Sequence, residues 1–307
     1  MKRAIALRVL SIIITLIFTS LLVFFFLDRA EGNSVSYLFS EDSIIEERLD
    51  NAPFFSRYSS FLKSFFSFDW GNDISGKDIK SLIKARAPLT IELALYSSLL
   101  SLLISLPLSI SASRDDSSIS RYTLSFLSSV SLALPSFLIA IILSLVGGYW
   151  LKLFPIAGFI PISNSLFGNI RSLFLPALTL SLSHIAIFLR LFLTTFKENL
   201  KGEYVLSAKG WGLSDKDILP HEVMKPSIPV LSSLIAQSLA TGIAGSAVVE
   251  NVFSLPGLGS MMLSAALKRD VALLGFMLLS LSIVVSLVFI VSEIISLLSD
   301  PREVKNA

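Results

Sequence analysis

The sequence contains no cysteine among its 307 residues and only two histidines, His184 and His221. The chain can therefore form no disulfide and no thiolate metal site. So few histidines also argue against a metal centre built on imidazole ligands. Charge is scarce as well, because charged residues make up 16% of the chain and the formal net charge is +2. So small a basic excess gives no reason to expect a nucleic-acid partner.

Motifs for catalysis are also missing. The sequence has no G-x-x-x-x-G-K-S/T segment that would cradle the phosphates of a nucleotide. It has no nucleophile accompanied by a suitable base in a known catalytic pattern. We therefore predict that the chain is not an enzyme and that it cannot hydrolyse ATP itself.

Apolar residues, in contrast, are abundant. The chain is 53% hydrophobic, and its mean hydropathy is +0.76. A helix that crosses a bilayer needs about 20 mainly apolar residues. The sequence predicts an all-α polytopic membrane protein with about six spans. These spans are expected at residues 9–27, 89–112, 122–149, 173–196, 228–249 and 271–298.

The first apolar run allows two interpretations. It is either a retained span or the core of a cleaved signal peptide. The run is long for a signal peptide, and no clear small-x-small cleavage site follows it. These features favour a retained span.

The basic residues indicate an orientation. Three of them precede the first predicted span, five lysines lie between residues 197 and 225, and two follow the last span. With six spans, these segments share one side of the membrane. Because basic residues concentrate in cytoplasmic segments, we expect both termini and the 196–227 loop to be cytoplasmic.

The spans divide the chain into four regions. Residues 28–88 form the longest connection, in which aromatic residues recur at helical spacing between residues 54 and 66. A second short helix is expected over 74–85, with Pro88 in the first turn of the next span. The predicted regions are an N-terminal tail and first span (1–27), an extracytoplasmic segment with short helices (28–88), a five-helix core (89–300) and a cytoplasmic tail (301–307).

A polar segment interrupts the apolar chain at 203–229. Gly210 and Gly212 can both adopt the positive φ that ends a helix. Ser214 is a candidate N-cap for a second helix, and Pro220 limits the predicted length of that helix. The segment is either a surface on which a partner docks or a solvated loop, and its composition alone does not separate the two.

Four ionisable residues, Glu92, His184, Arg190 and Glu293, lie within predicted spans, where such groups are expensive. Glu92 follows Pro88, so a helix N-terminus would stabilise its carboxylate; substrate binding is the alternative. For His184, a hydrogen-bonded packing role is favoured over a ligand role. Arg190 is expected to extend toward the cytoplasmic surface.

Two further groups of residues suggest roles inside the membrane. Serines recur in the second predicted span, for example Ser97, Ser98, Ser101 and Ser105. Such small residues favour close helix packing over substrate contact. At the end of the fifth span, a turn-rich stretch is a candidate for the extracytoplasmic mouth of a pathway. Its residues are Glu250, Asn251, Pro256, Gly257 and Gly259.

Several motifs resemble those of a known family. The pattern E-Y-V-x-x-A-x-x-x-G, at Glu203, Tyr204, Val205, Ala208 and Gly212, is similar to the cytoplasmic loop motif of ABC importer permeases. The resemblance is closest to the first-subunit (B-type) branch of the dipeptide/oligopeptide permeases. Seven further stretches and Arg190 follow the family's order. The stretches are DWG at 69–71, RAPLTIELA at 86–94, LPSF at 134–137, LPALTL at 175–180, VVENVFSLPGLG at 248–259, and KRD at 268–270 with DPR at 300–302.

The sequence departs from the family pattern at several positions. Leu193 stands where the family has a second arginine, and Leu255 stands where it has a tryptophan. The common A-K-G of the loop is replaced by Gly-Trp-Gly at 210–212, and the stretch from Gly212 to His221 is one residue short. The family's coupling role is therefore carried over only to the five motif residues between Glu203 and Gly212.

The resemblance implies a type I ABC importer permease fold with a cytoplasmic coupling helix. It further implies a subunit of the bacterial or archaeal cytoplasmic membrane, surrounded by lipid. Its partners would be a second homologous permease in a heterodimer, two ABC ATPases and an extracytoplasmic binding protein. ATP and magnesium would be bound by the ATPases, and this chain would hold no cofactor. The implied function is import of di- or oligopeptides by alternating access.

The sequence is also compatible with other functions. Members of the same subfamily carry nickel chelates or oligosaccharides. An ion-coupled secondary transporter would require midplane acids and inverted repeats, and neither is evident. An intramembrane hydrolase built on His184 and a serine is a remote alternative.

Overall fold

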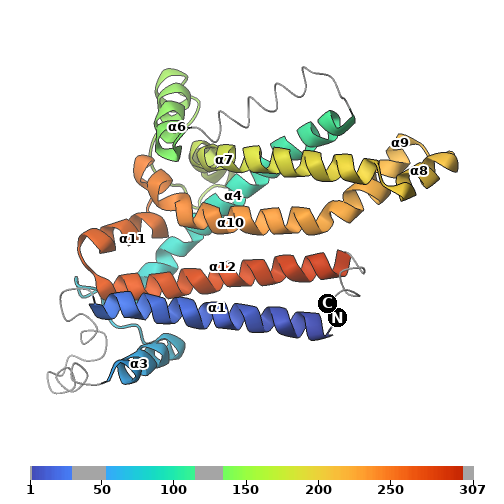
Figure 1. Cartoon of the computed structure of the whole chain (residues 1–307). Helices are drawn as coiled ribbons and strands as arrows, with labels where there is room; N and C mark the ends of the chain where they lie inside the picture. Colours follow the sequence, from blue (N-terminus) through green and yellow to red (C-terminus); the bar gives the residue numbers. More distant parts are fainter. Residues whose placement is uncertain (1, 30–52, 115–133, 300–307) are drawn as a thin grey trace. The chain divides into compact units, whose positions relative to one another are not determined.

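The computed structural model describes residues 2–29, 53–114 and 134–299, and these residues are almost entirely helical (Figure 1). Within these ranges no strand forms, and the only β-type pairing is an isolated bridge between Asn72 and Asp78. The helices are α1 (Lys2–Arg29), α3 (Phe54–Ser67), α4 (Ile79–Arg114), α6 (Ser136–Leu143), η2 (Ser144–Trp150, π-helical), α7 (Leu166–Leu200), α8 (Glu203–Gly210), α9 (Asp215–Ile218), η3 (Leu219–Met224, π-helical), α10 (Lys225–Val252), α11 (Leu258–Leu267) and α12 (Val271–Ser299).

Four described helices are long and apolar enough to cross a membrane. They are Ile79–Ser113, Leu166–Leu200, Leu219–Val252 and Val271–Ser299. They coincide with the second, fourth, fifth and sixth predicted spans. The first predicted span lies in α1, where Ile13–Phe26 is a shorter apolar helix. The third falls partly on residues outside the described ranges, and its described part is the apolar helix Ser136–Trp150.

One predicted boundary is wrong. Instead of a short helix at 74–85 and a new span after Pro88, a single helix, α4, begins at Ile79 and continues through Pro88. Asp78 starts it, because its carboxylate accepts a hydrogen bond from the Ser81 N–H at 2.8 Å. A proline inside a helix leaves the carbonyl four residues earlier without a donor. Lys84 and Pro88 are both exposed, so that carbonyl can reach solvent.

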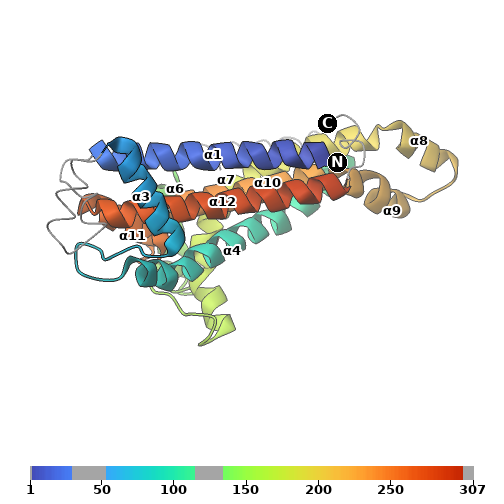
Figure 2. The same cartoon turned by 90° about the horizontal axis from the view of Figure 1, so that it is seen from below.

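The described residues form two compact units. Unit 1 contains Ile91–Leu255 and the end of α12 from Val288. Unit 2 contains α1 from Ile5, α3, the start of α4 up to Thr90, and Pro256–Leu287. Both α4 and α12 therefore contribute residues to each unit. In unit 1, α7 and α10 pack along each other and α6 packs against both (Figure 1). Figures 1 and 2 show α8 and α9 together at one end of this unit.

Small polar residues form the centre of unit 1. Ser97, Ser101 and Ser105 of α4 are fully buried. The neighbouring Ser98 shares a 2.7 Å hydrogen bond with Ser238 of α10. Ser101 also donates to the backbone carbonyl of Ser181 in α7, at 3.3 Å. These contacts confirm that the α4 serines pack against neighbouring helices.

An aromatic cluster forms the core of unit 2. Phe61 and Phe65 are the buried residues of α3, as their helical spacing predicts. Phe65 stacks on Trp70 with ring centroids 5.4 Å apart, and Trp70 stacks on Phe276 of α12 at 5.6 Å. The Trp70 indole N–H donates to the Phe65 carbonyl at 3.0 Å. The DWG stretch therefore has a structural explanation, because its tryptophan closes this cluster.

Candidate functional site

The polar segment between α7 and α10 comprises residues 201–224, and we call it the coupling segment. Its first helix is α8, which begins directly after a turn that ends α7. In that turn the Gly202 N–H donates to the Asn199 carbonyl at 3.0 Å. Glu203 lies in the first turn of α8 and Lys209 in the last. Both charges are favourable for the helix dipole.

The turn after α8 depends on one glycine. Gly212 has φ +82°, whereas Gly210 is the last residue of α8. The break predicted for both glycines is therefore made by Gly212. The Leu213 N–H donates to the Ala208 carbonyl and the Gly212 N–H donates to the Lys209 carbonyl, so the turn satisfies carbonyls at the end of α8. Ser214 precedes α9 at the predicted cap position, and its hydroxyl donates to the Asp217 carboxylate.

The prediction that Pro220 ends a short second helix is wrong. The chain remains helical from Asp215 through η3 into α10. Pro220 lies in η3, where the helix is wound with the wider π spacing. Such π-helical turns accommodate irregularities in a helix. Pro226 is in the first turn of α10 and Pro229 lies inside it. The second half of the coupling segment is thus a helical extension of the span that follows it.

The inner face of the coupling segment is anchored on α7 and α10. Val205 and Val223 are fully buried in a cluster with Phe192 and Phe196 of α7 and Leu234 of α10. A polar contact adds to this anchor. The Asn199 amide donates to the Val223 carbonyl at 3.1 Å and to the Ser227 hydroxyl at 2.9 Å. The Tyr204 hydroxyl donates to the Asn199 amide oxygen at 3.4 Å.

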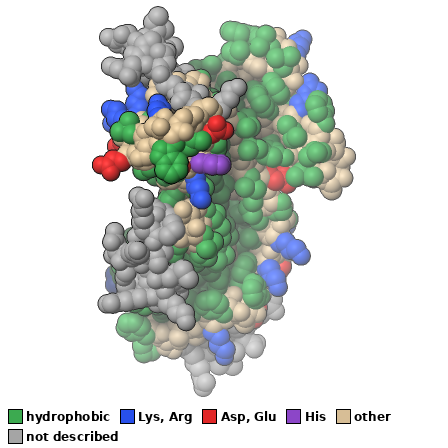
Figure 3. Space-filling view, turned by 90° about the vertical axis from the view of Figure 1, so that its right-hand side faces the viewer, with side chains coloured by type: hydrophobic (Ala, Val, Ile, Leu, Met, Phe, Trp, Pro, Cys, Tyr) green, Lys and Arg blue, Asp and Glu red, His purple; other side chains and the backbone are tan. Residues whose placement is uncertain are grey.

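The outer face of the coupling segment carries exposed apolar side chains. Trp211 is 89% exposed, Leu206 is 64% exposed, and Leu213 is also exposed. Figure 3 looks onto this end of unit 1, where lysine, acidic and histidine side chains surround apolar ones. Large apolar side chains in a polar rim are typical of protein-binding surfaces.

The five motif residues therefore divide between two roles. Val205 and Ala208 are buried and hold α8 in place, and Tyr204 is half-buried beside Asn199. Glu203 and Gly212 are exposed. Leu206 and Trp211 are the two most exposed apolar residues of the coupling segment. They lie between motif positions and were not among the predicted site residues. A tryptophan in a charged loop was the available signal for Trp211.

The candidate pathway residues Glu250 and Asn251 belong to unit 1. Glu250 is fully buried, and its backbone carbonyl accepts a 2.7 Å hydrogen bond from the Leu255 N–H after the end of α10. Asn251 is exposed, and its amide donates to the Ala247 carbonyl one turn earlier. Neither geometry identifies a substrate contact, so the pathway role of these residues stays a prediction.

The remaining candidates, Pro256, Gly257 and Gly259, belong to unit 2 and form the start of α11. Gly257 is the residue before the helix. The Leu258 N–H donates at 2.8 Å to the hydroxyl of Thr90 in α4. Thr90 thus caps α11 from a distant part of the sequence. Two motif stretches, RAPLTIELA and PGLG, meet at this bond.

Glu92 is not at a helix N-terminus, so the predicted reason for its stability is wrong. Because α4 begins at Ile79, Glu92 lies well inside the helix. Its carboxylate instead accepts a 2.8 Å hydrogen bond from the amide of Asn169, a fully buried residue of α7. The same amide group donates to the Ile160 carbonyl at 2.9 Å, and the Tyr96 hydroxyl donates to its oxygen at 2.8 Å. Asn169 therefore joins α4, α7 and the preceding loop.

His184 and Arg190, both in α7, have simpler surroundings. His184 Nε2 lies 2.9 Å from the Thr241 hydroxyl of α10. The Thr241 hydroxyl is also within hydrogen-bond distance of the Gln237 carbonyl, at 2.8 Å. The contact between His184 and Thr241 agrees with the predicted packing role of His184. Arg190 is exposed.

The chain is similar to known membrane transport proteins. A family model described as "Binding-protein-dependent transport system inner membrane component" matches residues 105–305. The chain is 26% identical to the nickel import system permease protein NikB of Staphylococcus aureus (strain MRSA252), over 98% of this chain and 92% of NikB. It is 27% identical to the oligopeptide transport system permease protein AppB of Bacillus subtilis (strain 168), over 96% of this chain and 97% of AppB.

The Asn169 contacts predict a measurable effect on stability. Replacing Asn169 with alanine removes two donors and one acceptor from a buried site, and leaves the Ile160 carbonyl and the Tyr96 hydroxyl without these partners. We expect the free energy of unfolding to fall by about 1–3 kcal/mol. Denaturant titration of the purified chain in detergent measures this change.

Asn164→Ala is the matched control, because Asn164 is exposed in the loop that precedes α7. Its side chain accepts one hydrogen bond, from the Ser163 hydroxyl. Its effect should stay within about 0.5 kcal/mol, as for other surface substitutions. Equal unfolding curves for the two variants would contradict the role given to Asn169.

Proposed function

The chain belongs to the family of binding-protein-dependent transport system inner membrane components, the permease subunits of ABC importers, and we propose that its cargo is di- or oligopeptides. As a permease it is a multi-pass inner membrane protein and a component of transport, not an enzyme. The peptide proposal is supported by the similarity to AppB over nearly the whole length of both chains.

The proposed assembly has five components. A second, homologous permease completes a heterodimer with this chain. Two ATPase subunits bind ATP and magnesium, and this chain itself binds neither. An extracytoplasmic binding protein delivers the peptide. In this arrangement both termini and the coupling segment lie in the cytoplasm, in agreement with the distribution of basic residues.

The coupling segment is the observation that supports this function best. Its outer face presents Leu206, Trp211 and Leu213 to a partner. Its inner face is locked to α7 and α10 by buried side chains and by Asn199. A force applied to α8 must therefore move the ends of both helices together. In the proposed mechanism the ATPase binds the outer face, and its motion is transmitted through the inner face.

Transport then follows from a shift between two states. ATP draws the two ATPases together, each coupling segment follows its ATPase, and the helices of the permease rock from one access state to the other. ATP can drive this change only because it binds the closed ATPase pair more tightly than the open one. The helical connection from α9 through η3 into α10 suits this task, because little motion is lost in a flexible loop.

Nickel is the second candidate cargo, because NikB matches the chain about as well as AppB does. Uptake assays on the assembled transporter, with labelled oligopeptides and with nickel, separate the two. We expect peptide uptake that depends on ATP and on this chain. Uptake of nickel without uptake of peptides would contradict the peptide proposal and leave the permease assignment intact.

Trp211 provides a test of ATPase docking. Truncating an aromatic anchor at a protein interface costs about 2 kcal/mol or more. We therefore expect Trp211→Ala to weaken the association of the permease with its ATPase roughly 30-fold or more, as measured by co-purification over a range of ATPase concentrations. Phe55→Ala is the control, because Phe55 is also a highly exposed aromatic residue, on α3. If both variants bind the ATPase like the unmodified chain, the outer face is not the docking surface.

Gly212 provides a test of mechanical coupling. A methyl group added at Gly212 would meet nothing within 4 Å, so only the positive φ restricts substitution there. Asparagine tolerates this conformation, whereas a β-branched residue is strained by about 1–2 kcal/mol. We expect Gly212→Val to lower transport per ATP hydrolysed in proteoliposomes, and Gly212→Asn to retain most of it. Unimpaired transport by Gly212→Val would show that the shape of this turn is unimportant.

A further inference from the structure

A second exposed region of unit 1 lies at the other end of α7. Residues 149–171 connect η2 to the first turns of α7, and we call them the 149–171 segment. The segment contains two basic residues, Lys152 and Arg171, and no aspartate or glutamate. Most of its other residues are apolar. A segment that combines apolar composition with an uncompensated positive charge is suited to an apolar, negatively charged partner.

The apolar side chains of the segment are largely uncovered by the described residues. Phe167 is 75% exposed, Trp150 is 70% exposed, and Tyr149 is 63% exposed. Leu151, Leu153 and Leu166 are exposed as well. All six residues lie at the ends of apolar helices or directly beside them. Tryptophan and tyrosine at such ends are typical of the interface between the hydrocarbon core and the lipid headgroups.

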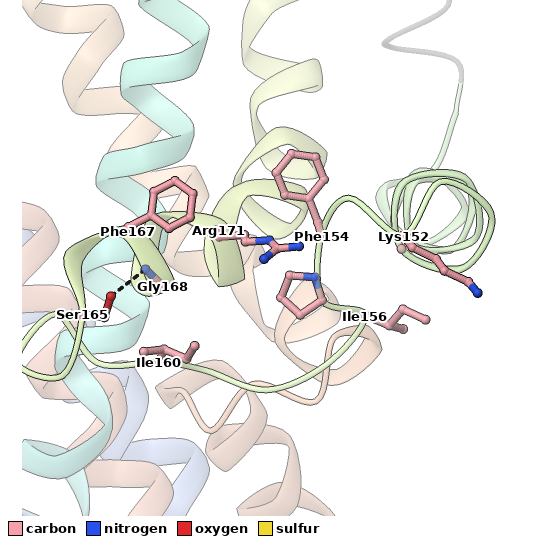
Figure 4. A pocket seen from close by; sticks show the side chains of 10 residues that line it. Lys152, Phe154, Ile156, Ile160, Ser165, Phe167, Gly168 and Arg171 are labelled. Atoms are coloured by element: carbon pink, nitrogen blue, oxygen red, sulfur yellow. Dashed lines mark hydrogen bonds between the residues drawn. The ribbon is translucent and has the colours of Figure 1, made fainter.

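Inside this segment is a cavity of about 580 Å³. Its apolar walls are formed by Phe154, Ile156, Ile160 and Phe167, and Arg171 and Ser165 provide polar groups (Figure 4). The Lys152 ammonium points away from the other labelled side chains in that view. Lys152 therefore belongs to the rim, and Arg171 carries the charge of the cavity.

The walls of the cavity are fixed to their surroundings. Phe154 stacks on Phe174 of α7, with ring centroids 4.5 Å apart. Ile156 lies so close to Gly148 that a methyl group there would come within 2.5 Å of Ile156 Cγ1. The Ile160 carbonyl accepts the Asn169 amide at 2.9 Å. The loop is thus held on η2 and on α7.

Arg171 is oriented and only partly satisfied. Its Nε donates to the Leu153 carbonyl at 2.9 Å, which holds the guanidinium on the loop. No described residue accepts a hydrogen bond from either terminal amino group. Ser165 accepts a 3.1 Å hydrogen bond from the Gly168 N–H, and its hydroxyl proton has no acceptor among the described residues. The cavity therefore offers several donors and no acidic group.

We propose that this cavity binds the phosphate headgroup of an anionic phospholipid. The planar guanidinium can bind two phosphate oxygens at once. The acyl chains would run along the exposed side chains of Tyr149, Trp150 and Phe167. A free anion would explain Arg171 but not the apolar surface around it, whereas a lipid matches both. The role of this lipid is to anchor one end of α7, and it does not depend on which cargo is transported.

Native mass spectrometry of the purified permease complex tests this proposal. The complex is incubated with equal amounts of phosphatidylglycerol and phosphatidylcholine that carry the same acyl chains. We expect the complex to retain phosphatidylglycerol preferentially. Arg171→Gln should reduce this preference about tenfold, because it removes charge-assisted hydrogen bonds. Arg171→Lys should give an intermediate value, because it keeps the charge and loses the bidentate geometry.

Lys84→Gln is the matched control, because it removes an exposed cation outside the segment and should leave the preference unchanged. A second measurement needs no variant at Arg171. Phosphatidylglycerol with brominated acyl chains should quench tryptophan fluorescence of the unmodified chain, and Trp150→Phe should lose most of that quenching. Inorganic phosphate in millimolar excess should not displace the lipid.

Four results would overturn the proposal. The first is an equal retention of the two lipids by the unmodified complex. The second is an unchanged preference in Arg171→Gln. The third is complete displacement of the lipid by inorganic phosphate, which would reduce the cavity to a simple anion site. Crosslinking of residue 167 to another protein subunit in place of lipid would likewise show that a protein covers this surface.

Discussion

Helices in a bilayer gain little by burying apolar surface against each other, because the lipid is equally apolar. What holds them together is close packing of small residues and hydrogen bonds between helices. Unit 1 follows this constraint. The buried serines of α4 contact α7 and α10. At Gly242 of α10, a methyl group would already touch Ala94 of α4 at 3.4 Å. The polar side chains inside this apolar unit are therefore structural elements in their own right.

The same constraint explains how the coupling segment and the 149–171 segment are fixed. Asn199 joins the coupling segment to the start of α10, and Asn169 joins the 149–171 segment to α4. Each amide satisfies a backbone carbonyl outside a regular helix, which would otherwise be costly to bury. One asparagine thus lies near each end of α7 and positions the irregular chain next to it. The long helices thus position the segments that connect them.

The sequence predicted the apolar helices well, because a run of about 20 apolar residues is specific. It predicted the turn at Gly212 and the aromatic face of α3 for similar reasons, since both depend on local residue types. It failed at Pro88 and Pro220, where exposed carbonyls or a wider helical turn accommodate a proline. It also gave the wrong reason for Glu92. Asn169 is 77 residues away from Glu92 in the chain, and no local pattern reveals such a partner.

The coupling residues illustrate the same limit. Spacing located α8, but the side of α8 that faces outward depends on the positions of Phe192 and Leu234, which come from two other helices. Once those helices are in place, Val205 and Ala208 are buried and hold α8 against them, whereas Leu206 and Trp211 face outward and can contact a partner. Arg171, in the first turns of α7, was overlooked for a related reason, because the sequence does not show that it lines a cavity without a carboxylate.

The two proposed binding surfaces, the 149–171 segment and the coupling segment, lie at opposite ends of α7. α7 has 35 residues and is therefore about 52 Å long at 1.5 Å per residue, which exceeds the roughly 30 Å hydrocarbon core. Both of its ends consequently extend beyond the core. If the ATPase moves the Leu200 end while lipid holds the Leu166 end, α7 rotates about its lipid-bound end. The displacement then grows along the helix toward α8. A lever of this kind needs a fixed point, and the headgroup site proposed beside Arg171 would supply one within the same unit.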